Sequence, residues 1–486
     1  MIAWQPTEML RRRRTKIVAT LGPVSSDAAT VQALAEAGAD VFRLNLAHGD
    51  RDSHARAYAA ARAAGEATGS PPAILADLSG PEIRIGSFSR GGIVLTEGQP
   101  VTMTTRETVG LPGTIPSRYP TLHEEIVSGD RILLGDGQLV LRVETVEGTE
   151  IICRVMRGGP VQEGMEMKLP DSELSTSALT ERGAEDLRFA VDLGVDYVAV
   201  SFVQRAADLE QVRSLLPAGD DAPKLIARIE RPHALREIEA IIDASDGVLV
   251  ARGDLGVELP AEDVPVVQRE LVSMARARNK PCIVATQMLE SMTSSTQPTR
   301  AEVSDVSTAV FSEADAVMLS VETASGGHPV EAVQMMDRIA RRIEAHLFAQ
   351  RRFRPDGAEP LPGSSPLAVA VARATAQLSR DQHCRAIVVV APDRGTDATV
   401  RVMSAARPGA PVVAALASTR ATLQTNVLWG VIPALMDAAD LSDSPQAARR
   451  LARRLGLAEF GEHVLVVEGF REDAEEDAPR IGVIRV

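Results

Sequence analysis

Three side chains that can do chemistry follow strand-like runs in the middle of this chain. Glu230 follows one apolar run, Asp254 comes shortly after a second, and Thr286 ends a third. Residues at the carboxyl ends of strands in an α/β fold converge on one mouth, where ligands bind. Two carboxylates at such a mouth suit Mg²⁺ or Mn²⁺, because these ions prefer oxygen ligands and take one or two carboxylates together with substrate oxygens.

A purely structural role competes with this interpretation. Asp254 lies where the next helix would begin and would only cap it, and Glu230 would only pair with an arginine. Either carboxylate alone leaves both interpretations open. Their paired placement at neighbouring strand ends favours a functional site.

The elements that position these side chains alternate between helices and strands. A helical segment, a small residue, an aspartate and a strand recur in that order, as at Gly194-Val195-Asp196 before Tyr197. Such alternation is typical of parallel βα units. Eight strands are predicted, the number that closes a (β/α)8 TIM barrel. They are Lys16–Leu21, Val41–Asn45, Ala73–Asp77, Tyr197–Val203, Lys224–Ile229, Val248–Arg252, Cys282–Thr286 and Ala316–Leu319.

Two further domains are predicted outside the barrel. After the third strand, short alternating runs between glycine-containing turns indicate β-hairpins of an all-β insert, which would lie over the mouth as a lid. Behind the barrel, a segment rich in Arg, Pro and Gly predicts a linker to an open α/β domain. The predicted boundaries are 1–86 and 172–350 for the barrel, 87–171 for the lid, 351–365 for the linker and 366–486 for the C-terminal domain.

Composition narrows the class of protein. The 486 residues are 45% hydrophobic, and no 18-residue apolar run offers a membrane span. A net charge of −14 argues against nucleic acid as a default partner. Three widely separated cysteines and the lack of a signal-peptide pattern indicate a cytoplasmic protein with reduced thiols. The basic run from Arg11 to Arg14 is predicted to be a solvated lead-in to the first strand. Only four lysines accompany 48 arginines.

Several blocks of sequence, in order and at proper intervals, resemble motifs of the pyruvate kinase family over nearly the whole chain. The blocks are Thr15–Pro23, Arg43–Gly49, Asp77–Arg84, Ala251–Gly256, Ala285–Met292 and Pro298–Glu302. The resemblance implies phosphoryl transfer from phosphoenolpyruvate to ADP, giving pyruvate and ATP, by a homotetramer. The transferring group in such a reaction needs positioning and charge neutralisation more than covalent help.

The resemblance also implies roles for individual residues. Glu230 and Asp254 match ligands of the Mg²⁺ ion, and Arg43 matches a phosphate-binding arginine. Arg84 matches an arginine that neutralises the moving phosphoryl group, at the nucleotide side. Thr286 matches the hydroxyl associated with protonating the enolate.

Other positions are carried over in the same way. The backbone around three residues would hold the substrate carboxylate: Ala251, Arg252 and Gly253. His48 would lie near the nucleotide, although a packed loop histidine is the commoner outcome. Asn45 and Asp77 match side-chain ligands of a monovalent cation, with Leu78 at the adjoining position.

The chain departs from the family pattern around the same site. Arg228 stands where the family has a lysine that faces the phosphoryl group, and arginine is longer, planar and forked. Ala47 replaces a usual serine, and Leu78 replaces a threonine, whereas Glu82 is kept; this mixture leaves K⁺ dependence open. In the lid, Glu163 falls where a lysine pair normally meets the nucleotide, which should weaken nucleotide binding.

Three functions therefore compete. The favoured one is a pyruvate kinase with altered nucleotide or ion requirement. The second is a non-catalytic relative that binds phosphoenolpyruvate and Mg²⁺ as a sensor or scaffold, since Arg43, Glu230 and Asp254 are kept while Arg228 replaces the lysine. The third is a metal-dependent lyase on a similar barrel, against which the lid insert and the terminal domain count.

Overall fold

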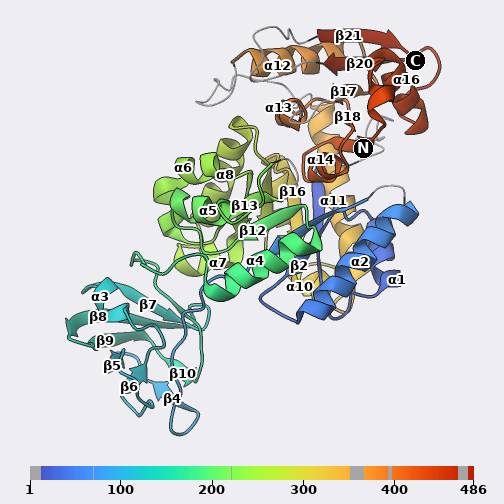
Figure 1. Ribbon diagram of the computed structural model, residues 1–486. Helices are drawn as coiled ribbons and strands as arrows, with labels where there is room; N and C mark the ends of the chain where they lie inside the picture. Colours follow the sequence, from blue (N-terminus) through green and yellow to red (C-terminus); the bar gives the residue numbers. More distant parts are fainter. Residues whose placement is uncertain (1–12, 69–70, 220–221, 351–365, 392–396, 469–479) are drawn as a thin grey trace.

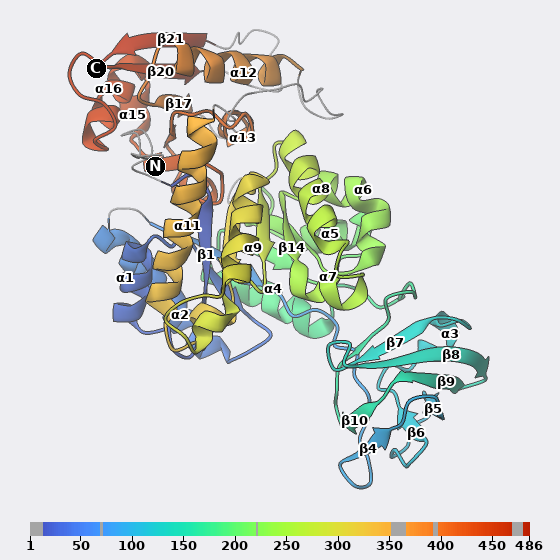
Figure 2. The ribbon, with the colours of Figure 1, turned by 180° about the vertical axis from the view of Figure 1, so that it is seen from behind.

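Three bodies are seen in the computed structural model, which describes residues 13–68, 71–219, 222–350, 366–391, 397–468 and 480–486. A barrel occupies the centre, a small β domain projects from one end, and an α/β domain covers the opposite end (Figures 1 and 2). The predicted linker at 351–365 lies outside the described residues. None of the helices in these ranges is long and apolar enough to cross a membrane.

The barrel is closed by eight parallel strands in the order β1-β16-β15-β14-β13-β12-β3-β2. The strands are β1 (Lys16–Leu21), β2 (Val41–Asn45), β3 (Ala73–Asp77), β12 (Tyr197–Val200), β13 (Lys224–Ile229), β14 (Gly247–Ala251), β15 (Cys282–Ala285) and β16 (Ala316–Leu319). All eight predicted strands are confirmed, but three end earlier than predicted. Phe202 and Thr286 have φ values of 61° and 69°, which take the chain out of the extended conformation, and Arg252 already begins a helix.

Helices surround the strands. They are α1 (Ala28–Ala37), α2 (Arg51–Thr68), α4 (Glu181–Leu193), α5 (Ala206–Arg213), α6 (Ile238–Ala244), α7 (Arg252–Glu258), α8 (Val264–Ala277), α9 (Arg300–Phe311), α10 (Val321–Ala324) and α11 (Pro329–Ala349), with 3₁₀ turns at Pro232–Glu237 and Glu290–Thr293. Alternate strand residues face the helices or the barrel interior, and both sets are buried. Strands covered on both faces read as continuous apolar runs, which is why they could be predicted from the sequence.

The insert after β3 is an all-β domain, as predicted. Its elements are β4 (Gly92–Leu95), β5 (Pro100–Thr104), β6 (Thr114–Pro116), α3 (Leu122–Glu125), β7 (Arg131–Leu134), β8 (Leu139–Glu147), β9 (Glu150–Arg157), β10 (Gly159–Gln162) and β11 (Met167–Lys168). The hairpins β7-β8 and β8-β9 are antiparallel. A separate apolar core of 21 buried residues lies inside this domain, so it is a body of its own.

The C-terminal domain is an open sheet in the order β19-β18-β17-β20-β21, with only the last strand antiparallel to its neighbour. Its elements are α12 (Pro366–Asp381), β17 (Ile387–Ala391), α13 (Asp397–Ala405), β18 (Val412–Leu416), α14 (Thr419–Gln424), β19 (Val431–Leu435), α15 (Ala438–Leu441), α16 (Ser444–Arg454), β20 (His463–Glu468) and β21 (Arg480–Arg485). The fold class is therefore the predicted one. The exact domain boundaries remain a prediction.

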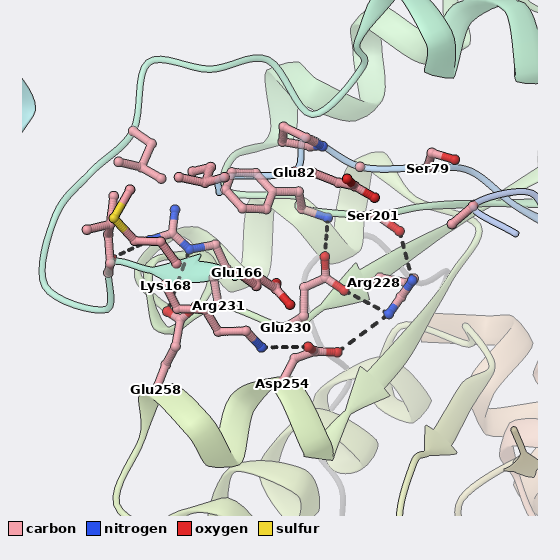
Figure 3. Close-up of a pocket in the computed structure, with 18 of the residues that line it drawn as sticks. Ser79, Glu82, Glu166, Lys168, Ser201, Arg228, Glu230, Arg231, Asp254 and Glu258 are labelled. Carbon is pink, nitrogen blue, oxygen red and sulfur yellow. Dashed lines mark hydrogen bonds and ion pairs between the residues drawn. The ribbon is translucent and has the colours of Figure 1, made fainter. Parts of the chain in front are cut away.

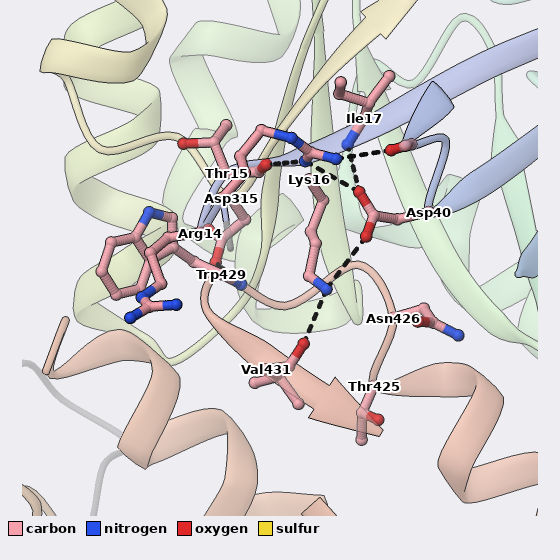
Figure 4. A network of polar contacts seen from close by, with 12 residues as sticks. Arg14, Thr15, Lys16, Ile17, Asp40, Asp315, Thr425, Asn426, Trp429 and Val431 are labelled. Atoms are coloured by element: carbon pink, nitrogen blue, oxygen red, sulfur yellow. Dashed lines mark hydrogen bonds and ion pairs between the residues drawn. The ribbon is translucent and has the colours of Figure 1, made fainter. Parts of the chain in front are cut away.

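A buried polar network joins the amino ends of the barrel strands to the C-terminal domain (Figure 4). The Lys16 ammonium donates to the Val431 carbonyl oxygen at 2.7 Å and lies 3.3 Å from Asp40. Arg13 pairs with Asp40 at 2.9 Å, and Arg14 is only 2% exposed. The sequence predicted that the basic run from Arg11 to Arg14 is solvated. This prediction is wrong for Arg13 and Arg14, because residues distant in sequence cover them. Arg11 and Arg12 lie outside the described residues.

Replacing Asp40 with Asn is expected to lower the free energy of unfolding by about 2 kcal/mol, the usual contribution of hydrogen bonds to a charged group, because it leaves two buried cations with one partner fewer. Burial alone would raise the pKa of the Asp40 carboxyl, but Arg13 and Lys16 hold it below its ordinary value. This contribution is thus present above about pH 4 and is lost as the pH falls below it. Urea unfolding at neutral and acidic pH measures the effect. Asp192→Asn, an exposed position on α4, is the control, and equal losses in both variants would contradict the account.

Candidate functional site

A cavity of about 180 Å³ lies between the carboxyl ends of the barrel strands and the lid. Of the predicted site residues, five line it: Asn45, Leu78, Arg228, Glu230 and Asp254. The lid contributes Glu166 and Lys168 (Figure 3). The remaining predicted residues are not part of its lining, and their positions are described below. The insert therefore lies against the predicted mouth of the barrel.

Glu230 and Asp254 face one another across this cavity. The Arg228 Nη2 atom lies 2.9 Å from the Glu230 carboxylate and 3.6 Å from that of Asp254. Glu230 also accepts the backbone N–H of Phe202 at 2.6 Å, and the left-handed backbone of Phe202 is what turns that N–H into the site. The two carboxylates therefore converge as predicted from their strand ends.

The competing structural roles are only partly seen. Glu230 does pair with an arginine, Arg228. Asp254 lies in the first turn of α7, but the N-cap of this helix is Ala251 and no side chain caps it. Instead, the Asp254 carboxylate points into the cavity, between Arg228 and Lys168 (Figure 3).

Arg228 is the centre of the charge network. Its Nη1 atom donates to the Ser201 hydroxyl at 2.8 Å and to Asp77 at 3.2 Å, while Nη2 serves the two carboxylates of the cavity. The side chain is 17% exposed. Although burial opposes the charged form, Asp77 and Glu230 raise the pKa of the guanidinium above its ordinary value. The two Nη atoms of arginine thus bind Asp77 and Ser201 on one side and the two cavity carboxylates on the other, which a single lysine ammonium could not do at once.

Arg43 does not direct its fork into the cavity. Its Nη2 and Nε atoms bind the buried Asp77 carboxylate at 2.6 and 2.7 Å, and Nη1 donates to the Thr20 hydroxyl at 3.2 Å. Burial would raise the pKa of Asp77, but Arg228 and Arg43 hold it below its ordinary value. The ionised Asp77 carboxylate therefore forms salt bridges with two arginines.

Thr286 lies at a strained turn after β15. A positive φ is costly for a β-branched residue, and such strain gathers at functional sites. Its hydroxyl accepts the Gly253 N–H at 2.6 Å and donates to the Ala285 carbonyl at 2.6 Å. A Cβ atom at Gly253 would lie 3.2 Å from this hydroxyl, so a glycine there permits the close approach.

Arg252 supports that turn from behind. It donates to the carbonyl oxygens of Thr286 and Gln287, each at 2.8 Å, and Asp305 lies 3.8 Å away. Ala251 is fully buried at the end of β14. The structure therefore places the stretch from Ala251 to Gly253 next to Thr286, beside the cavity and not in its lining.

Three further residues lie outside the lining of the cavity, whereas Asn45 is part of it. Arg84 pairs with Glu82 at 2.9 Å and donates to the Gly164 carbonyl at 2.9 Å, which places it at the base of the lid. His48 is exposed. The Asn45 side-chain oxygen accepts the Ala47 N–H at 3.3 Å. Glu163 lies in the same exposed lid turn as Gly164.

Sequence reasoning missed Lys168 and Glu166. Lys168 comes from the lid strand β11, and its ammonium lies 2.8 Å from the Asp254 carboxylate. Asp254 is thus approached by two cations, Lys168 on one side and Arg228 on the other (Figure 3). The signal was that Lys168 is one of four lysines in an arginine-rich chain. Spacing along the sequence, however, does not say that a strand of another domain reaches the barrel.

Arg231 holds the returning chain of the lid against the barrel. It donates to the Leu169 carbonyl at 2.6 Å and to Gln204 at 2.8 Å, and its guanidinium stacks over the Phe202 ring at 4.8 Å. The same Phe202 gives its N–H to Glu230. Lys168 is therefore positioned by the segment that also shapes the carboxylate site.

The charges that line the cavity suit a divalent cation. Five carboxylates line it against three cationic side chains, which gives a formal excess of two negative charges when all are ionised: Glu82, Glu166, Glu230, Asp254 and Glu258 against Lys168, Arg228 and Arg231. Burial raises the pKa of Glu230 to about 7, and burial also raises that of Glu166 and Glu258. Within the described ranges, no three acidic, His or Cys side chains form a metal site alone. Glu230 and Asp254 would share such an ion with substrate oxygens, as Mg²⁺ sites commonly do.

Comparisons with known proteins match pyruvate kinases along nearly the whole chain. The family model described as "Pyruvate kinase, barrel domain" matches residues 12–333, and "Pyruvate kinase, alpha/beta domain" matches residues 369–481. A pyruvate kinase of Agrobacterium vitis is 43% identical over 94% of this chain and 95% of its own length. One of Mycobacterium tuberculosis is 47% identical over 69% of this chain and 71% of its own. A crystal structure of a pyruvate kinase from Cryptosporidium parvum superimposes with a TM-score of 0.89 at 29% identity, covering 100% of this chain and 98% of that one.

Proposed function

The chain belongs to the pyruvate kinase family and is an enzyme of glycolysis; we propose that it transfers the phosphoryl group of phosphoenolpyruvate to ADP at the cavity between barrel and lid. The observation that carries this proposal is the convergence of Glu230, Asp254 and Arg228 at the strand ends. In the reaction, the bond between phosphorus and the enol oxygen breaks as an oxygen of ADP attacks phosphorus. The enolate then takes up a proton to give pyruvate.

Glu230 and Asp254 would hold a Mg²⁺ or Mn²⁺ ion, and the excess of carboxylates around them fits that cation. When bound, the ion would neutralise charge on the phosphoryl oxygens and polarise the substrate. Arg228 keeps a permanent positive charge beside both carboxylates, where it would stabilise the charge of the transferring group. It does so with one nitrogen of its fork, since the other is held by Asp77 and Ser201.

The other predicted residues take supporting roles. Arg43 and Asp77 hold each other as a neutral pair and, with Arg228, would leave one net positive charge behind the substrate phosphate. The Thr286 hydroxyl lies beside the Gly253 amide, where the enolate would be protonated. Arg84, at the base of the lid, would face the nucleotide together with His48 and Asn45. The lid itself would exclude water from the site.

A coupled assay of pyruvate formation from phosphoenolpyruvate and ADP, with Mg²⁺ and with chelator, tests the proposal. Activity that depends on the divalent ion supports it. Binding of phosphoenolpyruvate without turnover would instead support the sensor or scaffold, which Arg228 in place of lysine makes the second candidate. A lyase would instead form pyruvate without ADP from a carbon-chain substrate other than phosphoenolpyruvate.

Lys168 is expected to contribute a positive charge from the lid. Lys168→Met should lower kcat/KM for phosphoenolpyruvate by about 100-fold, because the anionic substrate loses one cation of a water-poor site. Lys168→Arg, which keeps the charge, should retain most of the activity. Steady-state kinetics of both variants decide the matter. Equal losses in the two variants would mean that Lys168 serves only to hold the lid in place.

The proposal also covers location and assembly. All three cysteines are free and buried, as expected of a protein that works in the reducing cytoplasm. We propose a homotetramer, as the family resemblance implies, with phosphoenolpyruvate and ADP as the small-molecule partners. Size-exclusion chromatography with light scattering would test the assembly.

A further inference from the structure

The buried Asp77 carboxylate is already surrounded by positive charge. Arg43 Nη2 lies 2.6 Å from Oδ2, and Arg228 Nη1 lies 3.2 Å from Oδ1. The Ser201 hydroxyl completes this surrounding at 3.4 Å. Asp77 itself is fully buried. One carboxylate thus serves two guanidinium groups.

The family resemblance assigns this place to a monovalent cation such as K⁺, but the residues present do not fit one. K⁺ needs several oxygen atoms to replace its hydration shell. Ala47 and Leu78 bring no side-chain oxygen, and Leu78 is only 3% exposed. The Asn45 side-chain oxygen accepts the backbone N–H of Ala47. A third cation beside Arg43 and Arg228 would also be repelled by both.

We infer that the guanidinium of Arg228 takes the place of the monovalent cation, so that this enzyme works without K⁺. The inference rests on the proposed function, because it concerns the ion requirement of the same site. One nitrogen of the fork binds Asp77 and Ser201, and the other faces Glu230 and Asp254. The arginine at position 228, in place of a lysine, therefore supplies both the charge that faces the substrate and the charge that Asp77 requires.

The three departures of the sequence then have one physical explanation. A lysine ammonium is a compact point charge and cannot span both groups, so a relative with lysine at 228 would need a separate cation at Asp77. Once the arginine fills that place, hydroxyl groups at positions 47 and 78 have no ion to bind. Ala47 and Leu78 are the residues expected where no ion has to be bound.

The test compares potassium salts with tetramethylammonium salts at equal ionic strength. The natural protein is expected to have the same kcat and KM in both. The double variant Arg228→Lys with Ala47→Ser, which restores an ammonium and a hydroxyl, should gain activation by K⁺ of about tenfold or more. Arg228→Lys alone serves as the second variant and should show the same direction. Strong activation of the natural protein by K⁺ would overturn the inference.

A binding measurement separates this inference from the proposed function. NMR of the thallous ion, a spectroscopic substitute for K⁺, reports occupancy without any turnover. The natural protein should show no saturable binding, and the double variant should bind the ion. If the natural protein is inactive in every salt, the proposed function fails, but thallous-ion binding still tests the inference. Saturable binding to the natural protein overturns the inference, and binding only to the variants supports it.

Discussion

Replacing Glu230 with Gln is expected to lower kcat/KM for phosphoenolpyruvate by about 10³-fold or more, which is what removal of a central electrostatic group costs in other active sites. The substitution keeps the shape of the side chain and removes one negative charge. Glu230 is mostly buried, accepts the Phe202 N–H and lines the cavity together with Asp254. Only its charge is lost, so binding of the divalent ion is lost with it.

The matched control for this variant is Glu237→Gln. Glu237 is exposed, at the end of the 3₁₀ turn that follows the same strand. Kinetics with Mg²⁺ and circular dichroism of both proteins measure the effect. A Glu230→Gln variant as active as the control would remove the carboxylate pair from the mechanism.

The second large effect is expected for Arg228→Met, which should lower kcat by about 10³-fold, comparable with the loss of an arginine finger. The variant removes the charge shared by Asp77, Glu230 and Asp254. It also leaves these three carboxylates, of which Asp77 is fully buried, without a common partner, so thermal unfolding should occur at a lower temperature.

Arg236→Met is the control for that variant, because Arg236 is exposed on the same 3₁₀ turn. Kinetics below the unfolding temperature separate loss of activity from loss of structure. If the folded Arg228→Met protein keeps full activity, Arg228 has no part in the reaction. A fully active variant would also speak against a non-catalytic sensor or scaffold.

The barrel could be predicted because local pattern and global fold agree. Each strand is covered on both faces, so it reads as an apolar run, and its last residues necessarily reach the same mouth. This reasoning placed Glu230 and Asp254 together correctly. It overran three strand ends. At two of them the chain turns through the positive φ of Phe202 and Thr286, and at the third Arg252 begins a helix; these are tertiary features that residue type does not reveal.

The partners of the charged residues could not be predicted in the same way. Arg43 matches a phosphate-binding position in sequence, yet its fork is held by Asp77 and Thr20. Lys168 reaches Asp254 from another domain, and Arg14 is buried where its basic neighbours suggested solvent. A side chain with several rotatable bonds takes its direction from charges that only the folded chain brings near.

Binding of Mn²⁺ followed by electron paramagnetic resonance, in the natural protein and in Glu230→Gln, tests the shared ion most directly. The natural protein is expected to bind one ion per chain with an affinity that phosphoenolpyruvate increases, because the substrate completes the two protein ligands. The variant should lose this site. Equal binding by both proteins, or a site indifferent to Glu230, would contradict the whole account.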